Sequence, residues 1–361
     1  MTVLGIGVCT GLLIAGFGLE DSIHSIGNLQ YGEIYTYDGT LTLDGACSEE
    51  AEEQLRKKLD VSEQIENYLF QYSGSIEIIS NGRKRTTDLL VPEIPGNMTD
   101  FIRLRNRVTG EKYELDADGI IISEKLANIL GVQAGDPVQV KTDDKKSADL
   151  KVIAVTENYF GHYVYMSPEL YEKVYGEKPF YDHVFMDTKD TSDEAEAAIR
   201  EAWMNLDAVT EISFLTEESE QAQNKLESME MITYILVLAA AVLAGVGLYD
   251  LNYVNICERS RELAVLKALG FHDIEVSMYV FRENIWLTLF GLVFGSGVGM
   301  VLHPLAAATT EVDRIMFGRN MDLSGFGWSI SLIVLISALV NYATHYKLTK
   351  IDIAESAKST E

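Results

Sequence analysis

The residue types that most often carry chemistry occur in this sequence without the spacing of a reactive site. No pair among the six histidines has the helical spacing that binds zinc. No G-x-x-x-x-G-K-[ST] phosphate loop is present, so nothing in the chain is expected to hold ATP. No nucleophile with a base partner is recognisable, which disfavours a membrane hydrolase. We therefore expect no catalytic residue, no metal site, no cofactor and no enzymatic activity of the chain itself.

A glycine-rich run, GSGVG at residues 295–299, resembles a fragment of a dinucleotide-binding motif. It lies inside a long apolar segment with no strand before it, so close helix packing is the better interpretation. Gly291, Gly295 and Gly299 recur at every fourth residue and would form a stripe of small residues on one helix face. We expect this stripe to let another membrane helix approach closely.

Two groups of basic residues might suggest a nucleic-acid surface, but their context argues against one. Residues 83–85 read RKR, and Arg103, Arg105 and Arg107 alternate along the chain. Both groups lie in a strongly acidic region and have no aromatic residues between them. A solvated strand face, or local balancing of acidic residues, is the favoured interpretation, and no nucleic-acid partner is expected.

The segment ERSRELAVLKALGF, residues 258–271, is charged at its start and then apolar, and it lies between two long apolar runs. Its leucines recur near helical spacing and Gly270 supplies a stop, so we expect a short amphipathic helix. Asp273 is expected to cap the helix that follows. The segment either anchors a loop at the membrane surface or docks a soluble partner, with its leucines and Phe271 as anchors. The residue pattern alone favours neither.

Four windows of about 20 apolar residues have the length needed to cross a hydrocarbon core of roughly 30 Å. They are residues 1–19, 232–254, 285–304 and 328–346. The first lacks the basic flank of a secretory signal and is longer than its usual apolar region, so we expect a retained span. The sequence therefore predicts a multi-pass membrane protein in a lipid bilayer.

The distribution of charge assigns the two sides of the membrane. Residues 22–228 carry 40 acidic and 20 basic residues, a net charge of −20 out of −26 for the chain. Long acidic domains translocate regardless of the positive-inside bias, whereas short basic flanks stay in the cytoplasm. Such flanks follow the second and fourth spans: Arg259, Arg261, Lys267, Lys347, Lys350 and Lys358. Both termini are therefore expected in the cytoplasm, although Arg314 and Arg319 in the predicted outer loop oppose this assignment.

The predicted fold is a four-helix, all-α transmembrane unit with an α+β extracytoplasmic domain inserted between the first and second spans. The expected segments are a first transmembrane helix (1–21), the extracytoplasmic domain with stalk helices at both ends (22–228), a second transmembrane helix (229–254), a cytoplasmic helix (255–273), a third transmembrane helix (274–304), an outer loop (305–327), a fourth transmembrane helix (328–346) and a cytoplasmic tail (347–361). At about 200 residues, the extracytoplasmic domain is large enough to bury its own core.

Strand and helix signals alternate within this extracytoplasmic domain. Alternating apolar residues predict strands at 31–37, 41–43, 75–79, 119–122, 137–140, 151–155 and 184–186, and helices are expected at 49–59, 124–130 and 192–204. Ser123 is expected as a helix N-cap and Gly131 as the residue after that helix. Asn81-Gly82 and Gly135-Asp136 are turn signals.

With these elements in place, the segment 258–271, followed by VFREN at 280–284 and a glycine-rich span, resembles the signature region of FtsX-like (MacB-type) permeases of ABC transporters. Residues 119–136, GIIISEKLANILGVQAGD, resemble the outer-domain motif of the same family. The resemblance covers nearly the whole chain, and it is strong over 255–303 and looser over 31–115. It implies a MacB-type periplasmic core for the inserted domain.

The resemblance also implies partners and site residues. Such permeases work with an ABC ATPase subunit and with a second permease copy or a homologous permease half. The short helix between the second and third spans contacts the ATPase. In this sequence the implied contact residues are Glu258, Arg259, Arg261, Glu262, Leu263, Leu266, Lys267 and Gly270. Residues 20–26 and 216–230 would be stalks that carry the first two spans outward.

The function implied by the resemblance is transmission of ATP-driven motion to the extracytoplasmic domain. The outcome would be export of a peptide or lipid-linked cargo, resistance to antimicrobial peptides, or activation of a wall hydrolase without transport. A membrane-anchored sensor or scaffold without an ATPase is the alternative. The sequence departs from the family in two ways. It has no fused nucleotide-binding domain as in MacB itself, so the ATPase is expected on another chain. It also has one four-span unit where the longest family members have two, which leaves open that it is part of a two-unit permease.

Overall fold

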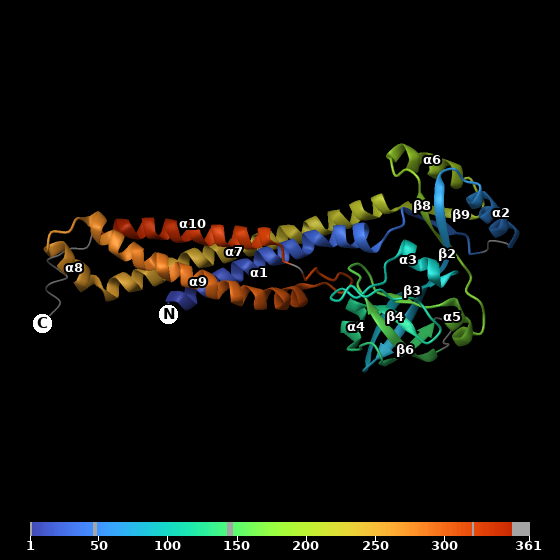
Figure 1. Ribbon diagram of the computed structural model, residues 1–361, viewed down its shortest axis with the longest axis horizontal. Helices are drawn as coiled ribbons and strands as arrows, with labels where there is room; N and C mark the ends of the chain where they lie inside the picture. Colours follow the sequence, from blue (N-terminus) through green and yellow to red (C-terminus); the bar gives the residue numbers. More distant parts are fainter. Residues whose placement is uncertain (1, 46–48, 143–146, 320, 349–361) are drawn as a thin grey trace. The chain divides into compact units, whose positions relative to one another are not determined.

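The computed structural model describes residues 2–45, 49–142, 147–319 and 321–348 (Figure 1). The chain divides into two compact units. Residues 2–25, 226–311 and 317–348 form the first, here called the membrane unit, and residues 26–225 and 312–316 form the second, the outer unit. The predicted cytoplasmic tail, apart from its first two residues, lies outside the described residues.

The membrane unit is built from long helices that run alongside one another and from the short helix α8, which lies at one end of them (Figure 1). Their bounds are α1 Thr2–Asn28, α7 Leu215–Glu258, α8 Ser260–Ala268, α9 Asp273–Thr310 and α10 Leu323–Leu348. Four of the five are long and apolar enough to cross a membrane, and each contains one of the four predicted windows. The prediction of four spans is confirmed. The chain passes between the two units within α1 and within α7.

The helix α1 is the central helix of the membrane unit. Half of its most apolar window is buried, compared with 22%, 17% and 22% for those of α7, α9 and α10. Leu13 of α1 is fully buried and packs with Val237 and Ala244 of α7 and with Ile333 of α10. The other three long helices therefore expose wide apolar faces, as helices that face lipid do.

The outer unit contains an α+β domain, which confirms the predicted class. Its described strands are β1 Gly39–Leu43, β2 Ile65–Ser80, β3 Arg83–Pro92, β4 Ile120–Ser123, β5 Pro137–Thr142, β6 Ser147–Thr156, β7 Tyr163–Tyr165, β8 His183–Thr188 and β9 Val209–Phe214. Its described helices are α2 Glu49–Asp60, α3 Met98–Phe101, α4 Glu124–Leu130, α5 Pro168–Tyr175 and α6 Asp193–Trp203, with a 3₁₀ turn at Pro95–Asn97.

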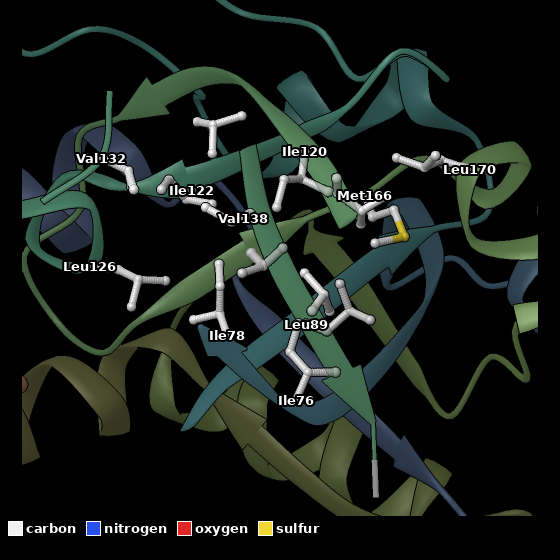
Figure 2. Close-up of a cluster of buried hydrophobic side chains, with 14 of the residues drawn as sticks. Ile76, Ile78, Leu89, Ile120, Ile122, Leu126, Val132, Val138, Met166 and Leu170 are labelled. Atoms are coloured by element: carbon white, nitrogen blue, oxygen red, sulfur yellow. The ribbon is translucent and has the colours of Figure 1, made fainter. Parts of the chain in front are cut away.

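Six of these strands close into a ring. The hydrogen-bonded order is β3-β7-β4-β6-β5-β2-β8-β1-β9, and β3 also pairs with β2. Side chains of β2 to β6 fill the interior together with α4 and α5, and Figure 2 shows several of them, including Ile78, Leu89, Ile122 and Met166, gathered between the strands. This ring of strands is a small barrel with a packed hydrophobic core.

The long strand β2 belongs to the ring and to a second sheet. Its residues 71–80 pair with β3, while residues 65–71 pair with β8. β8 continues the second sheet to β1 and β9. The helices α2 and α6 cover this sheet, and Trp203 of α6 is buried against Phe214 and Leu41. One strand therefore fixes the two cores of the outer unit to each other.

Most predicted elements of the outer unit are confirmed, including the Asn81-Gly82 turn. Both turn residues have positive φ, 51° and 72°, which is the conformation of a two-residue hairpin and joins β2 to β3. The predicted strand at 31–37 is wrong. There, a π-helical turn at Leu29–Ile34 continues α1, and Tyr35 forms only an isolated bridge with Ile102.

A buried side chain explains this exception. Gln30 is fully buried, donates to Asn158 Oδ1 at 3.0 Å and accepts from the Tyr159 backbone N–H at 2.7 Å. These bonds satisfy the buried amide while the chain stays helical past Asn28. The alternating tyrosines match a strand in period, but tertiary hydrogen bonds decide the conformation.

Candidate functional site

The predicted amphipathic helix is α8, and the residues around it define its two ends. Gly270 has φ 96° and so lies in the left-handed region, where the helix stops. The residue that caps α9 is His272, whose backbone N–H donates to Glu275 Oε2 at 2.8 Å in a capping box. The prediction of Asp273 as the cap is therefore wrong, because His272 has extended backbone angles and Asp273 is already helical.

One apolar face of α8 is buried inside the membrane unit. Leu263 is 1% exposed and packs with Ile256 of α7 and with Val276 and Val280 of α9, and Leu266 lies against the same cluster. Leu263 is thus placed in a core, where a soluble partner would not reach it. Burial of this leucine fixes the position of α8 relative to both neighbouring helices.

Two of the predicted basic contact residues are paired with acidic residues of α9. Lys267 Nζ lies 2.8 Å from Asp273 Oδ1, and only 8% of the Lys267 side chain is exposed. Arg259 forms a short ion pair with Glu283. These cations therefore join α8 to α9, and they present little free charge to the outside.

The opposite face of α8 is exposed and combines charged with apolar side chains. Arg261 and Glu262 are exposed, as is Glu258 at the end of α7, and within the described part of the chain Arg261 forms no ion pair. Val265 is 54% exposed and Leu269 71%. Phe271, just beyond the helix, is 49% exposed. Large exposed apolar residues with a charged rim are typical of a protein-binding surface.

The sequence analysis did not single out Val265, and it grouped Leu263 with the contact residues, whereas the structure buries Leu263 and exposes Val265. Residues four apart lie on the same face of a helix, so the spacing of Val265 and Leu269 could have indicated that they share one face. The direction of that face depends on the contacts of α8 with α7 and α9, so the sequence pattern could not fix it.

The predicted glycine stripe lies against α1. A side-chain carbon at Gly295 would be 2.6 Å from the backbone oxygen of Gly7, and one at Gly299 would be 3.3 Å from that of Gly11. Gly291 lies against Ile6 on the same face. The glycine stripe lets α9 approach α1 this closely, because its missing side chains leave room for Ile6, Thr10 and Ile14 of α1. The partner residues Gly7 and Gly11 have the same four-residue spacing in α1, a signal that the sequence analysis missed.

A ladder of polar side chains joins α9 to α10 and was also missed. Ser277 bonds His345 at 2.7 Å and Thr288 bonds Ser337 at 3.1 Å. Between them, Asn284 donates to Asn341 at 2.9 Å. These residues follow helical spacing on both helices. Such hydrogen bonds hold membrane helices together because unpaired polar groups are costly in hydrocarbon.

The short segment between α9 and α10, residues 312–316, belongs to the outer unit, and we call it the strap. Phe160 and Ile315 form an antiparallel bridge. The Gly161 N–H donates to the Arg314 carbonyl at 2.8 Å, and the Met316 N–H donates to the Tyr159 carbonyl at 2.9 Å. Arg314 also pairs with Asp88 at 3.2 Å. Backbone hydrogen bonds and an ion pair therefore hold this part of the predicted outer loop against the α+β domain.

A buried histidine lies beside the strap. His162 is 2% exposed and neither ring nitrogen has a hydrogen-bond partner among the described residues. Its Nε2 lies 3.9 Å from Asp313 Oδ2. Burial lowers the pKa of His162, an effect that Asp313 opposes and that Arg314, Arg85 and Lys125 reinforce. In the described residues, no three histidine, cysteine or acidic side chains gather as a metal site would require.

The alternating arginines of the outer unit balance nearby acidic residues. Arg105 contacts Glu157 at 2.6 Å and Glu33 at 2.7 Å, and Arg107 contacts Glu124 at 2.9 Å. This arrangement confirms the interpretation of local charge balance for these two residues.

Together, the four long apolar helices and the inserted α+β domain define a multi-pass membrane protein with an extracytoplasmic domain. Two families cover most of the chain. The MacB-like periplasmic core domain matches residues 2–202, and the FtsX-like permease C-terminal region matches residues 234–353. The chain belongs to the FtsX/MacB-type permeases of ABC transporters. Permeases of this type imply an ABC ATPase as a partner.

Individual relatives agree with this assignment. The chain is 24% identical over 305 residues to an uncharacterised ABC transporter permease of Methanocaldococcus jannaschii, covering 78% of this chain and 72% of that protein. It is 26% identical over 147 residues to the macrolide export ATP-binding/permease protein MacB 2 of Aeromonas hydrophila, covering 40% of this chain. That match spans only 22% of MacB 2.

Among solved structures, the periplasmic region of MacB from Actinobacillus actinomycetemcomitans aligns with 53% of this chain and 94% of its own length. Its sequence identity is 13% and its TM-score is 0.34.

Proposed function

We propose that this permease couples ATP hydrolysis on a separate ATPase subunit to movement of its outer unit. The observation that carries the proposal is the two-sided character of α8. One face is anchored in the membrane unit through Leu263, and the other presents Arg261, Val265 and Leu269 to the surroundings. A helix that is held on one side and exposed on the other can receive force from a bound partner.

The contacts of α8 with α7 and α9 determine which helices would move if a bound partner displaced α8. Lys267 joins it to the first residue of α9, and Leu263 packs against the last turn of α7 at Ile256. α7 is one helix of 44 residues, about 65 Å long at a rise of 1.5 Å per residue. Its residues 215–225 belong to the outer unit. A shift at one end of this helix would therefore reach the outer unit through a continuous backbone.

The basic residues around α8 support a cytoplasmic position for this end of the membrane unit and for both termini. The outer unit would then face the outside, with a net acidic surface that suits cationic partners such as basic peptides. Export of a peptide or lipid-linked cargo, or resistance to an antimicrobial peptide, is the expected outcome. Two permease copies, or this chain and a homologous half, would face the two subunits of an ATPase dimer.

Co-purification tests the proposal. The tagged full chain, purified from its native membranes, should retain an ABC ATPase identified by mass spectrometry, and the complex should hydrolyse ATP. Arg261→Glu and Leu269→Asp should each lower the retained ATPase at least about ten-fold, which corresponds to about 1.4 kcal/mol or more for a residue central to an interface. Matched exposed changes in the outer unit, Arg103→Glu and Val108→Asp, should leave it unchanged. A chain that purifies intact without any ATPase would instead support the sensor or scaffold alternative.

A further inference from the structure

A large apolar groove lies on the membrane unit between α9 and α10, near α8. Its volume is about 1230 Å³. The part within the spans is lined by Ile285, Leu289 and Leu292 of α9 and by Val334 and Ala338 of α10. Ile285 is 63% exposed and Leu289 48%, so the walls of the groove are open to the surroundings. An occupant of this part of the groove must be apolar, because both walls are membrane-spanning helices.

Apart from Tyr279 and Tyr342, the polar residues that line the groove are engaged with other described protein groups, with the exception of Arg282. His345 bonds Ser277, Ser337 bonds Thr288, and Asn341 accepts from Asn284. Glu275 accepts the His272 backbone N–H in the cap of α9. Arg282 is exposed at the groove, and within the described part of the chain it has no hydrogen-bond or ion-pair partner.

The height of Arg282 matches the headgroup layer of a bilayer. It precedes Ile285, where the 20-residue apolar window of α9 begins, by three residues, or about 4.5 Å of helix. Tyr279 and Tyr342, which also line the groove, are 54% and 78% exposed, and Trp286 is 56% exposed. Exposed tyrosine and tryptophan mark the membrane–water interface. The free guanidinium therefore lies where lipid phosphates lie.

We propose that this groove binds one anionic phospholipid, with its phosphate on Arg282 and its acyl chains along Ile285, Leu289 and Ala338. Arginine binds phosphate through paired N–H donors, and the apolar wall accommodates hydrocarbon. The lipid would come from the leaflet at the α8 end of the spans. The site is independent of the proposed ATPase coupling, because it requires neither a bound ATPase nor an exposed face on α8.

Native mass spectrometry of the purified full chain tests this site. The probes are phosphatidylglycerol and phosphatidylcholine with identical acyl chains, added at equal concentration to detergent micelles. The wild-type chain should retain one phosphatidylglycerol in preference to phosphatidylcholine. Arg282→Gln should reduce this preference about five-fold, corresponding to roughly 1 kcal/mol for one basic residue at an anionic lipid surface. Arg261→Gln, which removes an exposed arginine of α8 outside the groove, should not change it.

A second variant distinguishes the contribution of the apolar groove wall from that of the Arg282 charge. Ala338→Trp places bulk on an exposed position of the groove wall and should remove the retained lipid of both headgroup types while Arg282 is intact. Unchanged helical circular dichroism and elution volume confirm that the variants fold. Equal lipid retention by wild type, Arg282→Gln and Ala338→Trp would overturn the proposal. An equal loss of the phosphatidylglycerol preference in Arg261→Gln would also overturn it. If Ala338→Trp dissociates a dimer without changing the bound lipid, the occupant of the groove is a second chain and the proposal is likewise overturned.

Discussion

Lys267 Nζ of α8 lies 2.8 Å from Asp273 Oδ1, the side chain of the first residue of α9. Eight residues of this region were expected to contact an ATPase, and this pair shows that one of them faces the permease itself. With 8% of its side chain exposed, Lys267 is a link between two helices. A residue that links α8 to α9 should affect the response to the ATPase, whereas a residue that contacts the ATPase should affect its binding.

Lys267→Met should separate binding of the ATPase from the response to it. The apolar stem is retained and the ion pair is lost, at little cost in stability because Asp273 is half exposed. ATPase retention should stay within about two-fold of wild type, whereas stimulation of ATP hydrolysis by the reconstituted complex should fall severalfold. If retention falls as steeply as in Arg261→Glu, Lys267 contacts the ATPase directly and the assignment as a link is wrong.

The contact between α1 and α9 predicts a difference between two glycines of the same helix. Gly295→Ala would place a carbon 2.6 Å from the Gly7 carbonyl oxygen, whereas the same carbon at Gly297 would meet nothing within 4 Å. Overpacking of this kind costs about 1–3 kcal/mol, and an open position should cost almost nothing. Thermal unfolding of the purified chain in one detergent should show a lower midpoint for Gly295→Ala only. Equal midpoints for the two variants would contradict close packing at Gly295.

The strap predicts a disulfide between two engineered cysteines. Phe160 and Ile315 are a non-hydrogen-bonded antiparallel pair, because the hydrogen bonds on either side of them join their neighbours. In such pairs the side chains lie closest, with Cα atoms about 4.5 Å apart. In a chain whose native cysteines are replaced by serine, Phe160→Cys with Ile315→Cys should oxidise readily. Phe160→Cys with Val312→Cys should not. Thiol labelling before and after reduction measures the difference, and similar labelling of both pairs would place the strap elsewhere.

Asp187 predicts a pH-dependent effect on the outer unit. Burial, reinforced by Asp38, Glu66 and Asp100, raises the pKa of Asp187 to about 6 from an ordinary value of 3.8. The folded chain therefore binds this proton more tightly than the unfolded chain, so its stabilising contribution is present below pH 3.8 and is lost as pH rises through about 6.

Asp187→Asn should consequently raise the unfolding midpoint at pH 7.5 by about 2–4 °C, the effect of about 1 kcal/mol in a domain of this size. At pH 4 the two midpoints should converge, since the carboxyl is then protonated in the folded chain. Thermal unfolding of the full chain, followed by tryptophan fluorescence, checks both points. A difference that is constant across this pH range would indicate a cause other than titration of Asp187.

The sequence could predict the features of this protein that depend on local composition. The four spans follow from apolar length, and the hairpin at Asn81-Gly82 follows from turn chemistry. The ring of strands could not be predicted, because its closure depends on β3 pairing with both β7 and β2. The strand predicted around Tyr31 was wrong because Gln30 is held by residues more than a hundred positions away.

The same division applies to the site. The position of α8 and its stop at Gly270 were readable from residue types. Which leucine faces inward was not, because that is decided by the packing of Leu263 against Val276 and Val280. Pairing of Lys267 and Arg259 with acids of α9 likewise depends on how the two helices meet.

Site-specific photo-crosslinking tests the central claim most directly. A photoreactive residue at Leu269, which is 71% exposed, should crosslink the full chain to an ABC ATPase subunit in native membranes. The same residue at Leu263, which is 1% exposed, serves as the matched control and should give no crosslink to the ATPase. A clear product from Leu269 alone is the result that our account predicts. Absence of an ATPase crosslink from Leu269, or equal products from both positions, would contradict it.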